Sequence, residues 1–337
     1  MGDTYSKILI QNTVRKAIRD IRQTPRRSTR NLIDMALQFS TGRFQQEFFR
    51  MAQKMLTDEH SAYYPLLQEM ATHIDEDKLL TFGMNAGYNG GIQGAARIRQ
   101  TEQTSGYNIP WTLCLEIDRS GYFRNKDRYH LCIDEGERLG IYTWILFSHG
   151  CAEYCLELAV QHPNCAFVLF CDYGDINWSV IDCASELNNL MLCVPVDEDC
   201  AVICQLLREA KLLYSVYTFY GEADLYWLQN GDAFRDIEQL HPVFSVFIPK
   251  PDCPQHIQEL AYHTIHTARM GQHYATILWE LYRDCISVDR IISGDGCWAC
   301  FDTEGVLHGM DEHGQKHTAG SMELSLETLF QQLFPKE

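Results

Sequence analysis

Short apolar runs alternate with helical patterns throughout residues 109–270. The strands are predicted at residues 109–118, 142–147, 166–171, 190–196, 213–220 and 243–248, and the helices at 129–139, 151–162, 178–187, 200–210, 224–240 and 255–270. Strands that alternate with helices form parallel βα units with right-handed crossovers. The chain is therefore predicted to be an α/β protein with a partial parallel (β/α)6 TIM-type barrel over residues 108–270.

The segments on either side have different patterns. Residues 1–107 contain four or five short predicted helices, and residues 271–337 are rich in turns and end in a predicted helix, as in a small C-terminal module. The glycine-rich residues 83–94 are interpreted as a hinge or turn, since no strand precedes them and no Gly-Lys-Ser/Thr ending follows; a phosphate cradle is the alternative. We therefore expect three parts, 1–107, 108–270 and 271–337.

Charge and composition limit the classes of molecule that the chain is expected to bind. Residues 108–337 hold 14 Lys/Arg against 34 Asp/Glu, so duplex nucleic acid is not expected to bind them. We expect a cytoplasmic protein without membrane contact, because no apolar run has the length of a span and residues 1–20 lack a signal-peptide pattern. Most of the 14 cysteines are expected to be reduced core residues. The basic residues 7–30 predict a solvated or domain-docking helix face; contact with an anion and docking of a partner are the alternatives.

Carboxylates end the first predicted strand. After Pro110, apolar residues alternate with polar ones as far as Glu116 and Asp118, and parallel α/β folds place their chemistry at that end of the strands. His149 and Asp172 follow the next two strands. These four residues, Glu116, Asp118, His149 and Asp172, are the candidate acid–base or cation-binding set. The alternative is that they cap helices and solvate the rim.

The order of these segments resembles that of the radical S-adenosylmethionine (SAM) enzymes with a SPASM-type or twitch-type C-terminal extension. The similarity covers roughly residues 75–335 and rests on GYNIPWTLCLEID, DEGERLGIYTWILF, HPNCAFVLF, and GCWACFDTEGVLHG followed by SLETLF. It implies the barrel fold. The family's C-x3-C-x2-C loop, which holds an iron–sulfur cluster, corresponds here to residues 119–127, and these contain no cysteine.

The resemblance also implies cofactor-binding positions. Ser148, His149 and Gly150 replace the family's Gly-Gly-Glu-type SAM contact, and Asp172, Tyr173 and Gly174 replace its Thr-Asn-Gly-type turn. The implied SAM-facing residues are thus Ser148, Gly150, Tyr173 and Gly174. A chain changed in this way is expected to be a degenerate relative, a pseudoenzyme that acts as a binding or regulatory partner of a protein or peptide. Non-redox chemistry at the barrel mouth is an alternative.

Two groups of cysteines raise metal hypotheses. Cys151, Cys155 and Cys171 follow the second and third strands and would be the ligands of a relocated cluster; otherwise they are structural. Cys297, Cys300, His313 and His317 have the spacing C-x2-C-x12-H-x3-H, which suits tetrahedral zinc. The alternatives are a metal-free hairpin module or, by the resemblance, cysteines from an auxiliary-cluster region.

Overall fold

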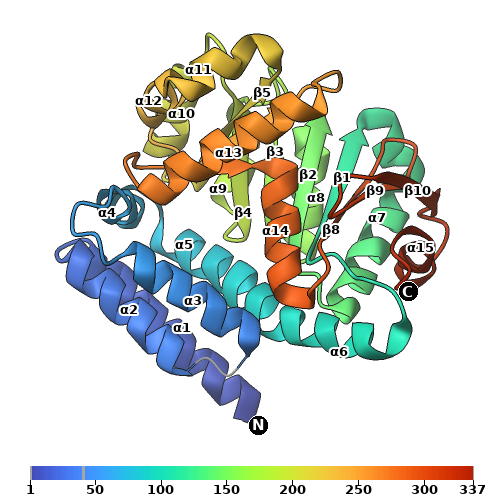
Figure 1. Cartoon of the computed structure of the whole chain (residues 1–337), viewed down its shortest axis with the longest axis horizontal. Coiled ribbons are helices and arrows are strands. Elements are labelled where there is room, and N and C mark those ends of the chain that lie inside the picture. The colour runs from blue at the N-terminus through green and yellow to red at the C-terminus, as the bar shows by residue number, and fades with distance from the viewer. Residues whose placement is uncertain (1, 40–41, 337) are drawn as a thin grey trace. The chain divides into compact units, whose positions relative to one another are not determined.

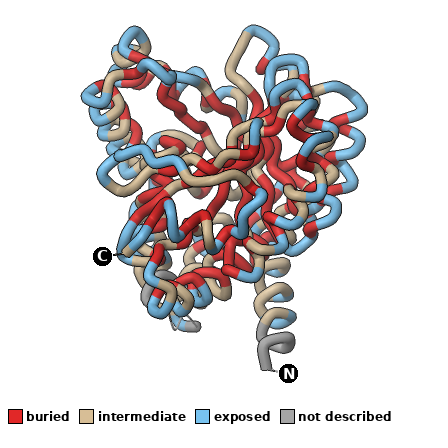
Figure 2. Tube along the Cα trace, turned by 90° about the vertical axis from the view of Figure 1, so that its right-hand side faces the viewer, coloured by how far each residue is buried: buried red, intermediate tan, exposed pale blue. Residues whose placement is uncertain are grey.

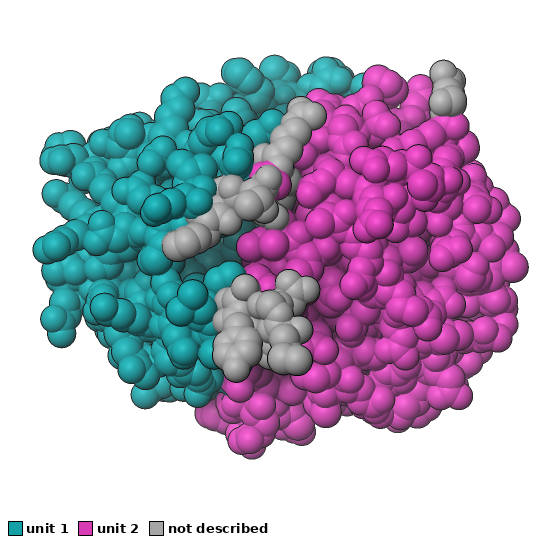
Figure 3. Space-filling model, turned by 90° about the horizontal axis from the view of Figure 1, so that it is seen from below, with its two compact units in different colours: residues 1–41, 46–80, 192–283 teal, residues 42–45, 81–191, 284–337 magenta. Residues whose placement is uncertain are grey.

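A computed structural model describes residues 2–39 and 42–336 (Figure 1). The chain forms two compact units that interleave in sequence (Figure 3). Unit 1 comprises residues 1–41, 46–80 and 192–283, and unit 2 comprises residues 42–45, 81–191 and 284–337. The domain boundaries expected after residues 107 and 270 remain a prediction. Each unit is described below by itself.

Unit 2 contains parallel strands from the first half of the predicted series. Strands β1 (Thr112–Asp118), β2 (Thr143–His149) and β3 (Ala166–Phe170) pair in parallel in chain order. On the other side of β1 lies β8 (Cys297–Phe301), also parallel, followed by the antiparallel strands β9 (Val306–Asp311) and β10 (Lys316–Ser321). The tail therefore continues the sheet that β1 begins.

The helices of unit 2 flank these strands in the chain. They are the π-helical segment η1 (Met84–Gly94), α6 (Ala95–Ser105), α7 (Arg119–Leu139), α8 (Ala152–Gln161), α9 (Trp178–Ser185), most of α14 (Leu281–Ser293), and α15 (Leu326–Leu333). The closing helix predicted for the tail is thus present as α15. Residues 274–284, whose sequence pattern fits either a strand or a helix, contain strand β7 (Ile277–Glu280) and the start of α14.

Unit 1 combines the N-terminal helices with the later strands. The parallel strands are β4 (Leu190–Pro195, with its last four residues in this unit), β5 (Tyr214–Tyr220), β6 (Phe244–Pro249) and β7. The helices are α1 (Gly2–Ile21), α2 (Pro25–Phe39), α3 (Arg43–Met55), α4 (Tyr63–His73), α5 (Glu76–Gly83, which continues into unit 2), α10 (Cys200–Glu209), η2 (Glu222–Asp224), α11 (Leu225–Gln229), α12 (Asp232–Glu238) and α13 (Gln255–Gly271). The mostly parallel α/β class is confirmed.

The first strand is more deeply buried than its alternating sequence predicts. Thr112 and Cys114 are as inaccessible as Leu113 and Leu115, so both faces of β1 are covered. Burial on both faces is expected of a parallel strand that helices and neighbouring strands cover. Buried residues fill the interior of the trace, and exposed ones follow its loops and outer helix faces (Figure 2). Only Glu116 and Asp118, at the end of β1, regain access to solvent.

The glycine-rich stretch is not the predicted hinge or turn. Residues 83–94 end α5 and form η1, and a Cβ on Gly94 would lie 2.2 Å from the carbonyl oxygen of Gly140. A Cβ on Gly140 would in turn lie 2.6 Å from the carbonyl oxygen of Gly94. These two glycines therefore allow two backbone segments to pack at close range. Close packing of the chain against itself accounts for them without a bound phosphate.

No helix within the described residues is both long enough and apolar enough to cross a lipid bilayer.

Candidate functional site

Two of the four predicted acid–base residues lie together at the carboxyl ends of β1 and β2. The Nε2 atom of His149 is 3.8 Å from a carboxylate oxygen of Glu116, and the two side chains are 47% and 44% exposed. The Glu116 carboxylate raises the pKa of His149, outweighing the partial burial that lowers it, and the charge of Asp172 acts in the same direction. This pair is a half-exposed, polar feature of the strand ends.

Asp118 has a structural role in the same region. It is the N-cap of α7: its Oδ1 accepts a hydrogen bond from the backbone N–H of Gly121 at 2.5 Å, and Ser120 also donates to its carboxylate. The helix predicted to begin at residue 129 therefore begins ten residues earlier, and residues 119–127 are its first turns. This hydrogen bond satisfies one of the backbone N–H groups that have no partner within the helix. It therefore stabilises the helix start although Gly121 is a poor helix former.

Ser148 lies near the end of β2, and Gly150 lies in the turn between β2 and α8. The Ser148 Oγ accepts a hydrogen bond from the backbone N–H of Cys151 at 3.0 Å, and the Cys151 thiol lies 3.1 Å from the carbonyl oxygen of Ile117. Gly150 has φ +70°, a conformation that favours glycine. The geometry of this turn thus accounts for both residues.

Asp172, Tyr173 and Gly174 form a second turn, after β3. The backbone N–H of Asp172 donates to the buried carboxylate of Asp175 at 2.9 Å, and the N–H of Tyr173 donates to Asp172 Oδ1 at 2.8 Å. Gly174 has φ +80°. The turn presents Tyr173, which is 68% exposed, and Trp178 at the start of α9 is 67% exposed. Two large aromatic side chains therefore face solvent near the end of β3.

The three cysteines that follow β2 and β3 are fully buried. Cys151, Cys155 and Cys171 each have 0% exposure, and Cys171 Sγ contacts the carbonyl oxygen of Leu169. A hydrogen bond from Cys155 lowers the pKa of Cys151, and the same bond together with burial raises that of Cys155. Cys151 and Cys155 therefore act as a donor–acceptor pair within the core.

The structure does not bring the four predicted zinc ligands of the tail together. Cys297 and Cys300 are three residues apart on β8, so their side chains point to opposite faces of the sheet. His317 pairs with Asp311 at 3.4 Å, and His313, whose side chain is 76% exposed, lies beside Glu312. A C-x2-C pair chelates a metal from a turn, and the extended backbone of a strand separates the two sulfurs.

Each tail cysteine instead has a core partner. Cys297 donates from its backbone N–H and from its thiol to Oδ2 of the fully buried Asp289, at 2.8 and 3.2 Å. The other oxygen of Asp289 accepts from the backbone N–H of Trp111 at 2.9 Å. Cys300 is in register with Cys114 of β1, and a hydrogen bond between the two thiols contributes to the raised pKa of Cys114 after its burial. These contacts join α14 and β8 to the entry of β1.

Sequence reasoning missed a different group of ligand-type residues. Among the side chains that the structure describes, one cluster of three His, Cys, Asp or Glu residues has its ligand atoms within 4.8 Å of one another: Asp134, Glu137 and His162. The signal in the sequence was the helical spacing of His130, Asp134 and Glu137, which places them on one face of α7. Because His162 follows a different helix, α8, sequence spacing alone does not place it beside Asp134 and Glu137.

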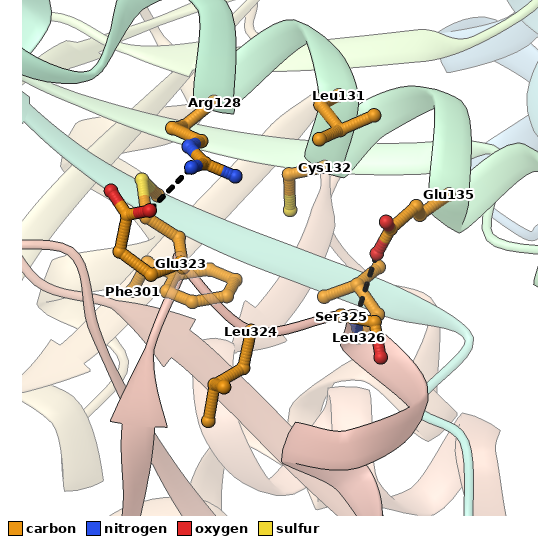
Figure 4. Close-up of a pocket in the computed structure, with 10 residues that line it drawn as sticks. Arg128, Leu131, Cys132, Glu135, Phe301, Glu323, Leu324, Ser325 and Leu326 are labelled. Atoms are coloured by element: carbon orange, nitrogen blue, oxygen red, sulfur yellow. Dashed lines mark hydrogen bonds and ion pairs between the residues drawn. The ribbon is translucent and has the colours of Figure 1, made fainter.

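Two of the pockets in the described part of the chain are candidate ligand sites. One, about 40 Å³ in volume, lies between α7 and the turn before α15, where Arg128 pairs with Glu323 and Glu135 accepts from the N–H of Leu326 at 2.8 Å (Figure 4). It is far smaller than the roughly 300 Å³ or more of ordinary ligand pockets. The other, about 320 Å³, lies in unit 1 beside Arg30, Asp34 and Gln53. Because the first pocket is so small, it is a narrow gap between packed side chains and not a ligand site.

The basic N-terminal segment is engaged within unit 1. Arg15 and Arg19 pair with Glu76 at 3.0 and 2.8 Å, and Arg22 donates to the carbonyl oxygen of Ala71. Arg30 donates to the hydroxyl of Tyr64 at 2.7 Å. These contacts fit the docking-face interpretation of residues 7–30 better than an anion site.

Comparison with known proteins gives remote structural similarity only. Neither a family model nor a curated protein matches the chain. Similar solved structures are those of Streptococcus suis SuiB bound to S-adenosylmethionine (6% identity, TM-score 0.48, 70% of this chain and 66% of that one) and bound to the precursor peptide SuiA (7%, 0.49, 71% and 68%). The structure of SuiB alone is also similar, with 6% identity, a TM-score of 0.49, and coverage of 70% of this chain and 68% of that one. The chain thus spans about two thirds of the length of these structures, and similarity this remote identifies no site residue.

Proposed function

We propose that the chain is a radical-SAM-like partial (β/α)6 barrel protein that lacks the SAM-binding cluster and acts as a non-catalytic binding or regulatory partner. The observation that carries the proposal is the start of α7. Residues 119–127, which correspond to the family's cluster loop, are helical, are capped by Asp118 and contain no cysteine. Three thiolates on a loop are needed to hold three irons and leave the fourth for SAM. The donor set at this position does not fit the cluster.

The arrangement of the other thiols supports the same proposal. Cys151, Cys155 and Cys171 are buried free thiols, and Cys151 and Cys155 are hydrogen-bonded to each other. Burial contributes to the raised pKa values of Cys155 and Cys171, and cysteines that behave as small core residues in this way are poor cluster ligands until the core opens. The turns at Ser148–Gly150 and Asp172–Gly174 have local structural roles. No residue of this region requires SAM to explain its contacts.

The proposed binding surface is the carboxyl-end edge of β1–β3 in unit 2. It includes the half-exposed pair Glu116 and His149 and the exposed aromatic side chains of Tyr173 and Trp178. Aromatic side chains are favoured anchors at protein interfaces because they bury a large area at little entropic cost. This edge belongs to residues 108–337, which hold 34 Asp/Glu against 14 Lys/Arg. We therefore propose a basic peptide or protein segment as the ligand, in keeping with charge complementarity.

Anaerobic iron–sulfur reconstitution followed by a SAM cleavage assay tests the loss of cluster chemistry. The expected result is substoichiometric iron and no release of 5′-deoxyadenosine. Cys151→Ser and Cys171→Ser are assayed in parallel. A stoichiometric cluster in the parent protein that disappears in both variants would establish relocated ligands and overturn the proposal.

A selection from a displayed peptide library tests the binding surface. Peptides selected on the parent protein should be enriched in Lys and Arg and should lose at least about tenfold in affinity for Trp178→Ala, as is common for aromatic anchors. Tyr226→Ala is the matched control, since Tyr226 is 77% exposed but belongs to unit 1. Equal loss in both variants, or no enrichment of basic residues, would count against this surface.

Non-redox catalysis by Glu116 and His149 is the second candidate function. The specific observation in its favour is the 3.8 Å pair whose carboxylate raises the pKa of His149, as in a general acid or base. A hydrolase substrate panel assayed with the parent protein and with His149→Gln tests it. Turnover that vanishes in His149→Gln but persists in Asp118→Asn would favour this candidate over the binding role.

A further inference from the structure

The group Asp134, Glu137 and His162 lies at the end of unit 2 opposite to the site described above. Asp134 and Glu137 belong to the last turns of α7, and His162 follows α8 and precedes the first residue of β3 by four positions. The group is therefore at the amino-end edge of the parallel strands, whereas Glu116 and His149 are at the carboxyl-end edge. In parallel α/β folds the amino-end edge usually serves stability.

The separations of the ligand atoms suit one metal ion. The Nδ1 atom of His162 is 3.4 Å from Asp134 Oδ1 and 3.8 Å from Glu137 Oε1, and all three ligand atoms lie within 4.8 Å of one another. Ligands that are roughly 2.0–2.1 Å from a tetrahedral zinc ion are about 3.4 Å apart. Small side-chain rotations would bring the three atoms to that geometry.

Hydrogen bonds already orient the histidine. The Nε2 atom of His162 is 3.0 Å from Nδ1 of His130, so one ring nitrogen is engaged and the other faces the carboxylates. Metal-binding histidines commonly have such an outer partner, which sets the tautomer and the ring orientation. The backbone carbonyl of His162 accepts from the side-chain amide of Asn189 at 3.2 Å. The ring is thus held at both its side chain and its backbone.

The loop that follows His162 is fixed by side-chain amides. Asn85 donates to the carbonyl oxygens of Pro163 and Cys165, at 2.8 and 2.9 Å, and Asn89 donates to that of Asn164 at 2.8 Å. Rigid support of this kind lets ligands keep their positions without an ion present. A preorganised loop is expected at a binding site and is unnecessary for a merely solvated surface turn.

The charge of the group also favours a cation. The thiol of Cys165 donates to the Glu137 carboxylate at 3.5 Å. Within the described residues, neither Asp134 nor Glu137 forms an ion pair with a lysine or arginine side chain. The two carboxylates of the group therefore have no lysine or arginine side chain as an ion-pair partner in the described part of the chain.

We infer that Asp134, Glu137 and His162 bind one divalent transition-metal ion of the zinc type, with His130 as the positioning residue of His162. The mixed nitrogen and oxygen ligands suit zinc or its first-row neighbours better than calcium, which prefers six or more oxygens. The ion would join the end of α7 to the loop before β3. Three protein ligands leave one position for water.

Zinc binding to purified protein, followed by calorimetry and thermal unfolding, tests the inference. The parent protein should bind one zinc ion and gain thermal stability, because a ligand that binds only the folded state stabilises it. Asp134→Asn, whose side chain is 60% exposed and so is not needed for folding, should lose at least about tenfold in affinity. Glu137→Gln should do the same. Asp127→Asn, an exposed carboxylate on the same helix, should bind like the parent protein.

Cobalt substitution separates this site from the cysteines of the chain. Nitrogen and oxygen ligands give weak visible bands, whereas thiolate ligands add intense charge-transfer absorption in the near ultraviolet. The expected spectrum lacks the thiolate band and is unchanged by Cys297→Ser. A thiolate band that Cys297→Ser removes, or equal zinc affinity in the parent protein, Asp134→Asn and Glu137→Gln, would overturn the inference.

Discussion

The Oδ1 atom of Asp118 accepts a hydrogen bond from the backbone N–H of Gly121 at 2.5 Å, and this contact starts helix α7 directly at the end of β1. No loop separates the strand from the helix. The contact fits the helix-cap interpretation of Asp118, at the strand end where catalytic carboxylates are commonly found.

Asp118→Ala should lower the free energy of unfolding by about 1 kcal/mol, the usual cost of losing an N-cap side chain. Asp118→Asn should retain most of the stability, because an amide oxygen can accept the same hydrogen bond. Urea unfolding followed by circular dichroism measures both. If Asp118→Asn were as unstable as Asp118→Ala, the negative charge rather than the cap would be what matters.

Gly94→Ala should destabilise the protein by about 1–3 kcal/mol, the range for an overpacked core site. The new Cβ would lie 2.2 Å from the backbone carbonyl oxygen of Gly140, which cannot move without shifting the end of α7. Gly87→Ala, also in η1, is the control, since a Cβ there meets no atom within 4 Å. That variant should be neutral or slightly stabilised. Equal stability of the two variants in urea unfolding would contradict the close approach.

Glu116→Gln should lower the pKa of His149, because the carboxylate 3.8 Å away is the main cause of its elevation. A histidine whose pKa is raised on folding contributes stability below its unfolded pKa of about 6.5, and this contribution is lost as the pH rises through the folded pKa. NMR titration of the His149 ring measures the shift. Asp118→Asn is the control and should leave the titration nearly unchanged; an equal shift there would mean that Glu116 is not the cause.

Asp289 should make the protein less stable as the pH rises. Burial raises its pKa to about 8, despite the bonds from Cys297 and Trp111, which act in the opposite direction. The folded state therefore holds a proton that the unfolded chain, with a pKa of about 3.9, has already released. The free energy of unfolding should fall between roughly pH 4 and pH 8 through this group.

Asp289→Asn isolates that contribution, because an amide does not titrate in this range. The variant should show a shallower loss of stability from pH 4 to pH 8 in urea unfolding. Its stability at pH 5 should be lower by about 1–3 kcal/mol, since the amide nitrogen cannot accept the hydrogen bond that one carboxyl oxygen now receives. Asp295→Asn, a change six residues further along the chain, should leave the slope as it is. An unchanged slope in Asp289→Asn would show that another group titrates.

Local sequence patterns predicted the elements of the α/β series well. The run that ends at Asp118 is a strand, and the segments around Ile145, Val168, Val216 and Phe244 are strands as well. These predictions succeeded because strand and helix periodicity reflects burial within a few residues of each position. One error was also local: the pattern predicts a helix start at residue 129, whereas the capping bond of Asp118 starts the helix at residue 119.

Long-range contacts could not be derived from the same patterns. The spacing of Cys297 and Cys300 suits zinc, but the pairing of β8 with β1 extends the backbone and turns the two sulfurs to opposite faces. Asp289, Cys297 and Trp111 meet although 178 positions separate Trp111 from Asp289. Spacing in the sequence constrains a ligand set only where the backbone conformation between the ligands is known.

The order of residues alone establishes that this chain alternates strands and helices, that residues 119–127 supply no thiolate, and that the segment after residue 107 is acidic. The tertiary structure decided which side chains meet: Glu116 with His149, Asp289 with Cys297, and His162 with Asp134 and Glu137. The physical reason is that periodicity records whether a position is buried, whereas the partner of a buried or charged group depends on strand order and helix crossovers that bring distant residues together.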